Sequence, residues 1–376
     1  MRSLTLPDPV ASPSDASNRF NSAANSVALG QALFFDKGLS LNNDIACASC
    51  HEPRLYFTDG KRKSVGSREL QRNSPTLLGV AHSDWFYWDG RRDSLWSQAL
   101  TPIETPGEMD SNRIAVVRHV MTQKAYADSV QELVEELPDL ETLPESGGPY
   151  GSAEDKSRWA ALSEDKRRQV NEAFAAIGKF IATYVATLEP RPSRFDAYVA
   201  SLASDSGELS PLAENEIRGL RLFLDPQKTQ CLRCHNGPYF SNYGFSNIGT
   251  SIGENGELPD FGRMIGLQAA LVDEFNCVGR YSDAEPDGCG HHRYAAKNHA
   301  DNGAFKVPTL RNVAMTAPYM HDGRFDDLIS VLEFYRDPPS KDISNHELPP
   351  LDLTDAELRD LASFLSSLTG PAAEQE

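Results

Sequence analysis

The stretches CASCH at residues 47–51 and CLRCH at residues 231–235 are two copies of one pattern, C-x-x-C-H, in a chain of 376 residues. The pattern is the attachment signature of c-type haem, in which two thiols bond one porphyrin and the next histidine becomes a ligand of its iron. A C-x-x-C pair can also bind zinc or exchange disulfides, but zinc needs two further ligands per site, and a thioredoxin-type site would not place histidine after both copies. We therefore predict two covalent haems. They are bound by Cys47, Cys50, His51, Cys231, Cys234 and His235, with His51 and His235 as the proximal ligands.

The segments around the two motifs repeat each other. The elements P-T-L, V-A, D-G-R and L of residues 75–95 recur in residues 308–328 at a constant offset and without a gap. Upstream of each motif, GQALFFD (residues 30–36) resembles GLRLFLD (residues 219–225). The repetition predicts that a module with one haem has been duplicated.

Periodicity and breaker residues place the expected elements. Residues 140–157 are rich in Gly, Pro, Ser and acidic residues and predict a loop, whereas apolar residues at helical spacing predict one long helix over residues 158–188. The prolines of residues 190–212 indicate the crossing between halves. We expect a mainly α fold with few short strands, made of two cytochrome c-like haem domains at residues 1–205 and 206–376.

Two regions of the second half have their own signals. Residues 240–310 contain many Gly and Asn residues and predict an irregular excursion. Residues 352–368 predict an amphipathic helix with Thr354 as its N-cap, because Glu357 follows three residues later.

Composition excludes some classes of function. The net charge of −18 argues against nucleic acid as a partner, since phosphate would be repelled. No run of 18 apolar residues is present, so we expect no membrane span. Residues 1–25 are polar and contain no signal peptide, but the cysteines indicate an oxidising compartment. We expect a periplasmic protein whose export signal is absent from this chain.

The sequence resembles the bacterial di-haem cytochrome c peroxidase and MauG superfamily from about Leu29 to Tyr335. Besides the two haem motifs, the resemblance is carried by GQALFFD (30–36), RNSPTL (72–77), WDGR (88–91), LRNVA (310–314) and TAPYMHDG (316–323). It implies that the first haem reacts with hydrogen peroxide and that the second stores or relays oxidising equivalents. It also implies that Trp88 lies between the haems as an electronic bridge, although a core role for this indole is compatible with that position.

The resemblance implies two further sites. A calcium ion would lie between the modules, bound by Asn73 and the backbone carbonyls of Thr316 and Pro318, and oxygen ligands suit calcium. The distal pocket of the first haem would contain Gln98, Pro102 and Glu108, with Glu108 as the acid–base group that moves a proton between the peroxide oxygens. Without the resemblance, Glu108 would be interpreted as a solvated loop carboxylate.

One departure from the family pattern concerns the first haem. Ordinary peroxidases of the family have a distal histidine in the loop after the first C-x-x-C-H, which must leave before peroxide binds. Between His51 and Trp88 the only histidine is His82, and it lies beyond the expected position. We predict a first iron with one open face, which needs no reductive activation.

A second departure concerns the other iron. Counted from His321, the position where ordinary peroxidases have a ligand methionine is Tyr335, and MauG-like enzymes have tyrosine there. An ionised phenolic oxygen favours ferric and higher states, whereas thioether sulfur favours ferrous iron. The alternative is that Tyr335 only packs on a helix and that Met315, Met320 or Met264 binds iron. The tryptophan that MauG has before its second haem motif is replaced by Thr229, so we expect the MbnH-type branch.

Cys277 and Cys289 remain outside the haem motifs. We expect them to form a disulfide, because a pair of exposed thiols is unusual in an oxidising compartment. The neighbouring His291 and His292 could bind a metal, but we expect a solvated pair.

Three functions follow from the resemblance. The first is a MauG-like enzyme that uses hydrogen peroxide to reach a high-valent state of the bis-Fe(IV) type and oxidises a Trp or Tyr residue of a partner protein at long range. The second is an ordinary periplasmic peroxidase that takes electrons from a small cytochrome. The third is a di-haem electron carrier without catalysis.

Overall fold

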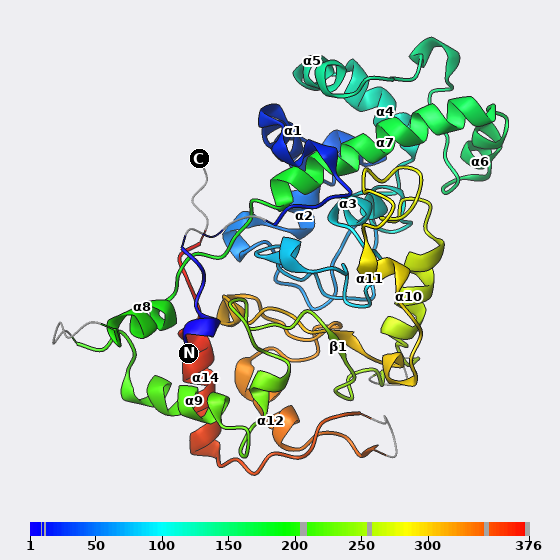
Figure 1. Cartoon of the computed structure of the whole chain (residues 1–376). Coiled ribbons are helices and arrows are strands. Elements are labelled where there is room, and N and C mark those ends of the chain that lie inside the picture. The colour runs from blue at the N-terminus through cyan, green and yellow to red at the C-terminus, as the bar shows by residue number, and fades with distance from the viewer. Residues whose placement is uncertain (9, 11–12, 204–208, 254–257, 342–345, 373–376) are drawn as a thin grey trace.

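The computed structural model describes residues 1–8, 10, 13–203, 209–253, 258–341 and 346–372, and it is mainly helical (Figure 1). The helices of the first half are α1 (Ala24–Phe34), α2 (Cys47–Cys50), α3 (Leu95–Glu104), α4 (Arg113–Thr122), α5 (Lys124–Leu133), α6 (Ala153–Ala160) and α7 (Glu164–Val185). Those of the second half are α8 (Arg194–Ser201), α9 (Glu214–Leu224), α10 (Arg263–Val272), α11 (Gly290–Arg293), α12 (Leu328–Arg336) and α14 (Asp355–Ser366). Strand β1 (Phe245–Ser246) pairs antiparallel with β2 (Phe305–Lys306), and Phe245 lies opposite Lys306. The expected mainly α fold with few short strands is confirmed.

Helix α7 is the centre of the first half. The hydroxyl of Ser163 accepts a hydrogen bond from the Lys166 amide and caps the helix, and two acidic residues in the first turn favour its N-terminus. Helices α1 and α3 pack against α7 and bury most of its second half (Figure 1). Phe174 and Phe180 on α7 are fully buried in this first hydrophobic core.

A second hydrophobic core lies between α9 and α14. Phe223 of α9, Phe364 of α14 and Phe195 of α8 contact one another there, together with Phe240. Leu4 from the N-terminal segment also belongs to this core. The division of the chain at residue 205 stays a prediction. Leu4 and α8 precede that residue but pack in the second core, and packing alone does not define a domain boundary.

The glycine that begins each upstream repeat has a packing reason. A Cβ atom on Gly30 of α1 would lie 1.9 Å from the Phe180 carbonyl oxygen of α7. A Cβ atom on Gly219 of α9 would lie 1.9 Å from the Asp360 carbonyl oxygen of α14. Each glycine therefore allows a helix to cross its partner backbone to backbone, and the duplicated sequence preserves this contact in both halves.

The rest of the repeat also has the same geometry in both halves. The D-G-R turns each close an antiparallel bridge, Phe86 with Arg92 and Tyr319 with Phe325. Tyr87 and Met320, at matching positions, both have positive φ, 69° and 73°. The structure therefore repeats where the sequence repeats.

The structure corrects two of the predicted elements. Residues 158–188 do not form one helix, because α6 ends at Ala160 and Ser163 caps a separate α7. The crossing at residues 190–212 contains α8. The C-terminal prediction is confirmed, since Thr354 and Glu357 form a capping box at the start of α14.

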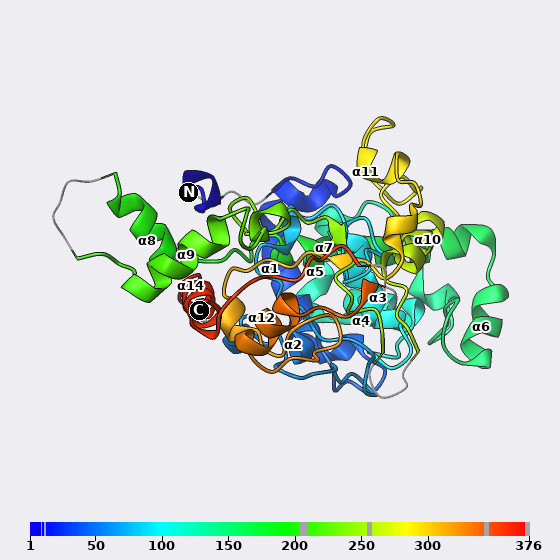
Figure 2. The same cartoon turned by 90° about the horizontal axis from the view of Figure 1, so that it is seen from below.

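The excursion of the second half reaches back to the first. Helices α10 and α11 lie on the side of the molecule away from α8 and α9 in both views (Figure 1, Figure 2). Phe275 packs into the first core, and the Cys277 amide donates to the Asp93 carboxylate at 3.0 Å. Within the described residues, no helix combines the length and the apolar character that a membrane crossing needs.

Candidate active site

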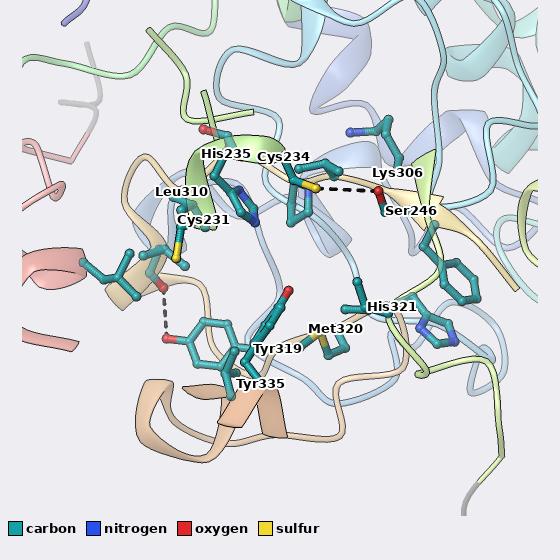
Figure 3. Close-up of a pocket in the computed structure, with 18 of the residues that line it drawn as sticks. Cys231, Cys234, His235, Ser246, Lys306, Leu310, Tyr319, Met320, His321 and Tyr335 are labelled. Carbon is teal, nitrogen blue, oxygen red and sulfur yellow. Dashed lines mark hydrogen bonds between the residues drawn. The ribbon is translucent and has the colours of Figure 1, made fainter. Parts of the chain in front are cut away.

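The motif at residues 231–235 lines a large apolar cavity in the second half, which we call the C-terminal cavity. Cys231, Cys234 and His235 all contribute to its wall (Figure 3). The His235 Nδ1 atom lies 2.9 Å from the Phe240 carbonyl oxygen. Because a carbonyl only accepts, Nδ1 carries the proton, which leaves the Nε2 lone pair free for a metal. Burial lowers the pKa of His235 and keeps the ring neutral, as a ligand must be.

The motif at residues 47–51 lines a second, narrower cavity in the first half, the N-terminal cavity. Here the His51 Nδ1 atom lies 3.0 Å from the Phe57 carbonyl oxygen, so Nε2 is again the free atom. Burial lowers the pKa of His51. The residues that line this cavity include Cys47, Cys50, His51, Gln98, Pro102 and Glu108. The structure thus brings the predicted distal residues to the motif, although Glu108 follows Cys47 by 61 residues in the sequence.

The thiols fit haem attachment better than zinc binding or disulfide exchange. Both pairs are free in the structure. Burial raises the pKa of Cys47 to about 12 and that of Cys50 to about 11, so these groups are neutral thiols and not the thiolates that disulfide exchange needs. Among the described residues, the cluster of acidic, His and Cys side chains with metal-ligand spacing is Asp93, Cys277 and His291, away from both motifs.

Glu108 is held in the wall of the N-terminal cavity by its backbone. Its carbonyl accepts from the Ser67 amide at 2.9 Å, and Gly66 packs directly on its Cα. Burial raises the pKa of the Glu108 carboxyl, and the guanidinium groups of Arg91 and Arg92 partly offset this effect. Glu108 is therefore a half-buried carboxyl with increased proton affinity, which is the property of an acid–base group.

Tyr87 is a residue of this region that the sequence reasoning missed. Its hydroxyl is buried and has no hydrogen-bond partner among the described residues. Burial and the nearby Glu108 raise its pKa, and the Arg91 guanidinium lies 3.5 Å from the centre of its ring. The sequence could have indicated Tyr87, because it directly precedes Trp88 and is equivalent to Met320 in the repeat.

Trp88 lies where the two halves meet. Its indole Nε1 donates to the Asn73 carbonyl oxygen at 3.0 Å, and its own carbonyl accepts from the Lys306 amide at 2.7 Å. The side chain lines the C-terminal cavity. The hydrogen bonds thus fix this indole between β2 and the segment that follows the first haem motif.

Tyr335 enters the C-terminal cavity from α12, on the side opposite the motif. Its hydroxyl and the His235 ring point toward one another (Figure 3). Burial and the nearby thiols of Cys231 and Cys234 raise the pKa of Tyr335 in the absence of a cation.

The other predicted residues of this cavity are placed differently. Met320 also lines it, whereas Met315 is 49% exposed and Met264 lies on α10 outside the lining. His321 lines the cavity edge, and its ring stacks on Phe305 at 3.7 Å between centroids. Of the three methionines, Met320 is thus the one whose position allows it to replace Tyr335 as the iron ligand.

The residues expected to bind calcium all contribute to the wall of one cavity. Asn73, Thr316 and Pro318 line the C-terminal cavity. Asn73 donates its amide nitrogen to the Lys61 carbonyl at 2.8 Å, so its amide oxygen is the atom left for a cation. This donor set of oxygens fits calcium.

The structure confirms the expected disulfide and corrects the expectation for its neighbours. Cys277 and Cys289 are joined by a disulfide. The expected solvated pair is wrong for His292, which is buried with its Nδ1 atom 2.5 Å from the Asp93 carboxylate. His291 is half-buried, and its Nε2 atom lies 2.9 Å from the Asp93 carbonyl oxygen. The Cys277 sulfur is used by the disulfide, so this cluster does not form a metal site.

Comparisons with known proteins agree with this geometry. The sequence profile described as di-haem cytochrome c peroxidase matches residues 24–204. The methylamine utilization protein MauG of Methylorubrum extorquens is 32% identical over 92% of this chain and 79% of its own length. Cytochrome-c peroxidase IdrP1 of Pseudomonas sp. (strain SCT) is 30% identical over 92% of this chain and 81% of its own length.

A solved structure shows the same fold. The crystal structure of a MauG-like protein associated with microbial copper homeostasis superposes with a TM-score of 0.64, covers 97% of this chain and 92% of that protein, and is 24% identical. The similarity to MauG and to the peroxidases extends over both halves and both haem motifs. The chain therefore belongs to the di-haem cytochrome c peroxidase and MauG family of haem-dependent oxidoreductases, in which two haems and hydrogen peroxide are the expected cofactors and substrate.

Proposed function

We propose that this protein is a periplasmic MauG-like enzyme that uses hydrogen peroxide to oxidise a Trp or Tyr residue of a partner protein at long range. The observation that carries the proposal is the N-terminal cavity. Its described lining contains His51 as the imidazole, and Glu108 and Gln98 as polar partners. His82, the remaining histidine before Trp88, lies outside that lining and bonds to Glu189.

The residues of the N-terminal cavity divide the work on peroxide. The haems would supply the iron that binds peroxide and the storage of its two oxidising equivalents. Glu108 takes a proton from the near peroxide oxygen and delivers it to the far one, and the Gln98 amide orients the peroxide by hydrogen bonding. Pro102 has no backbone N–H and keeps this wall apolar, which limits competing water.

The residues of the C-terminal cavity favour storage of oxidising equivalents. His235 and Tyr335 would both hold one haem iron, and the hard phenolic oxygen would stabilise its oxidised states. Trp88 joins the two halves through hydrogen bonds to Asn73 and Lys306. A partner protein needs no deep pocket, because its residue is oxidised at a distance.

An ordinary peroxidase is the second candidate. It is favoured by the similarity to IdrP1 and by Met320, which supplies a sulfur in the C-terminal cavity. In that case one iron would become reactive only after the other is reduced.

The two candidates differ in the oxidation state that reacts. One equivalent of peroxide is added to the fully ferric protein and, separately, to the half-reduced protein, and the Soret spectrum is followed by stopped flow. The proposal predicts a rapid change in the ferric protein. A change only in the half-reduced protein would identify an ordinary peroxidase, and no change in either would leave an electron carrier.

A further inference from the structure

A tyrosine next to the C-terminal cavity has a base within hydrogen-bond distance. The Tyr239 hydroxyl donates to Glu189 Oε2 at 2.8 Å and lies 2.5 Å from His82 Nε2. His82 Nε2 in turn lies 2.8 Å from Glu189 Oε1, and the His82 and Tyr239 rings lie 4.2 Å apart. We infer that Tyr239 is a proton-coupled redox residue, which carries oxidising equivalents between the C-terminal cavity and the protein surface. The inference rests on the proposed function, which supplies the oxidant.

Two other tyrosines at this cavity bond to carbonyl oxygens instead of a base, and a third, Tyr335, faces the haem motif. Tyr319 donates to the Val313 carbonyl at 2.9 Å, and Tyr243 donates to the Gly79 carbonyl at 3.1 Å. A phenol that loses an electron becomes a strong acid, so it is oxidised readily only where a neighbour can take its proton. A carbonyl oxygen cannot hold that proton at neutral pH, whereas a carboxylate or an imidazole can.

Tyr239 is also positioned between the cavity and solvent. Tyr243 lines the cavity, and its ring centre is 6.2 Å from that of Tyr239. Gly79 lines the same cavity, and the Tyr239 ring packs against it so closely that a Cβ atom would lie 2.6 Å from the ring. At the other end of the network the side chains of His82 and Glu189 are 22% and 14% exposed. The network therefore leads from the cavity to the surface.

Oxidation of Tyr239 moves one electron and one proton in opposite directions. Tyr239 loses one electron toward the oxidant in the cavity, and its hydroxyl proton moves to Glu189 Oε2. The neutral tyrosyl radical then takes one electron from the reductant, a partner-protein indole or phenol, and the proton returns from Glu189. Two such cycles supply the two electrons that hydrogen peroxide needs, and peroxide with two protons becomes two waters.

Two further tyrosines are matched controls. Tyr319 lines the cavity but has no base. Tyr126 on α5 has a carboxylate partner in Asp36 but does not line either cavity. If the cavity and the base are both required, only Tyr239→Phe should remove the radical, and Tyr319→Phe and Tyr126→Phe should leave it.

The test uses the haem-loaded protein, mixed with one equivalent of hydrogen peroxide and freeze-quenched for electron paramagnetic resonance. We expect a tyrosyl signal in the wild type that is lost in Tyr239→Phe and kept in Tyr319→Phe and Tyr126→Phe. Glu189→Gln keeps the size of the side chain but removes the carboxylate base, so the signal should form about a hundredfold more slowly.

Other outcomes overturn the inference. A tyrosyl signal that persists in Tyr239→Phe, or that Tyr319→Phe removes equally, excludes Tyr239. If Tyr239→Phe does not fold, a nitroso spin trap on the wild type followed by peptide mapping decides, and an adduct on any peptide without Tyr239 rejects the proposal. A Soret spectrum that peroxide leaves unchanged shows instead that the proposed function itself is wrong.

Discussion

Proton placement decides the chemistry at the scale of single residues. His51 and His235 each direct Nδ1–H to a backbone carbonyl and present Nε2 to a cavity. Glu108 lies in the wall of the N-terminal cavity, where burial raises the pKa of its carboxyl. We propose that a neutral imidazole and a carboxyl with increased proton affinity, which line the same cavity, together assist peroxide cleavage.

Replacing Glu108 tests this assistance. Glu108→Gln should slow the reaction of the ferric protein with peroxide about 10²- to 10⁴-fold, because the amide cannot take the proton. In the wild type the rate should fall as the pH falls through the carboxyl pKa, and this acid limb should lie above the usual range of a glutamate because burial raises that pKa. Stopped-flow rates measured across pH check the slowing and the acid limb. Glu104→Gln is unsuitable as a control, because Glu104 pairs with buried Arg113.

The exposed Glu145→Gln is the matched control for Glu108, and it should keep the wild-type rate and pH profile. If Glu108→Gln keeps the acid limb, the proton is moved by another group.

Tyr335 gives a second prediction at this scale. Tyr335→Met should raise the reduction potential of the C-terminal haem, because a thioether favours ferrous iron and a phenolic oxygen favours ferric iron. Spectroelectrochemical titration measures the potential. Met320→Leu should leave it unchanged; the reverse pattern would assign the ligand to Met320.

Sequence reasoning succeeded for residues whose chemistry is local and failed for those whose partners are distant. Each C-x-x-C-H motif lies within five residues, so both histidines could be named as candidate ligands, and the structure places each beside a cavity. His292 was expected in solvent because its partner Asp93 is remote in the sequence. His82 was used only to exclude a ligand position, since nothing near it in sequence indicates Tyr239 and Glu189.

At the scale of helices, close crossings determine how the elements pack. The duplicated glycines Gly30 and Gly219 could be recognised as a repeat, but their reason is visible only in the contacts of α1 with α7 and of α9 with α14. Conversely, the apolar spacing over residues 158–188 predicted one helix and not two, because Ser163 was not recognised as the cap that starts α7. Periodicity reports which face is buried, whereas capping decides where a helix begins.

Gly30→Ala and Gly219→Ala should each destabilise the protein by about 1–3 kcal/mol, since the new methyl group would overlap a carbonyl oxygen and force the helices apart. Urea unfolding followed by circular dichroism measures the loss. The exposed neighbour Gln31→Ala on the same helix should change the free energy of unfolding by less than about 0.5 kcal/mol. Equal effects of Gly30→Ala and Gln31→Ala would contradict the crossing argument.

At the scale of the whole molecule, contacts between the halves hold the site together. Trp88 is hydrogen-bonded to both halves, through Asn73 and Lys306. The α10–α11 excursion ties the second half to Asp93 and the first core. A cation held by Asn73, Thr316 and Pro318 would add a third connection beside Trp88.

Calcium removal tests that connection. We expect one calcium per chain by elemental analysis, lost on dialysis against a chelator, with a lower midpoint of thermal unfolding because the ion binds only the folded state. Calcium should restore the midpoint, and magnesium should not, because it demands a tighter octahedral site. A chain that contains no calcium before chelation would contradict the site.

The central claim is that one iron keeps an open face while the other is held by a phenolic oxygen. Low-temperature electron paramagnetic resonance of the fully ferric protein tests it most directly. We expect one high-spin signal from the haem of His51 and one low-spin signal from the haem of His235, which Tyr335→Phe alters and Met320→Leu does not. Two low-spin signals, or a low-spin signal that depends on Met320, would contradict it.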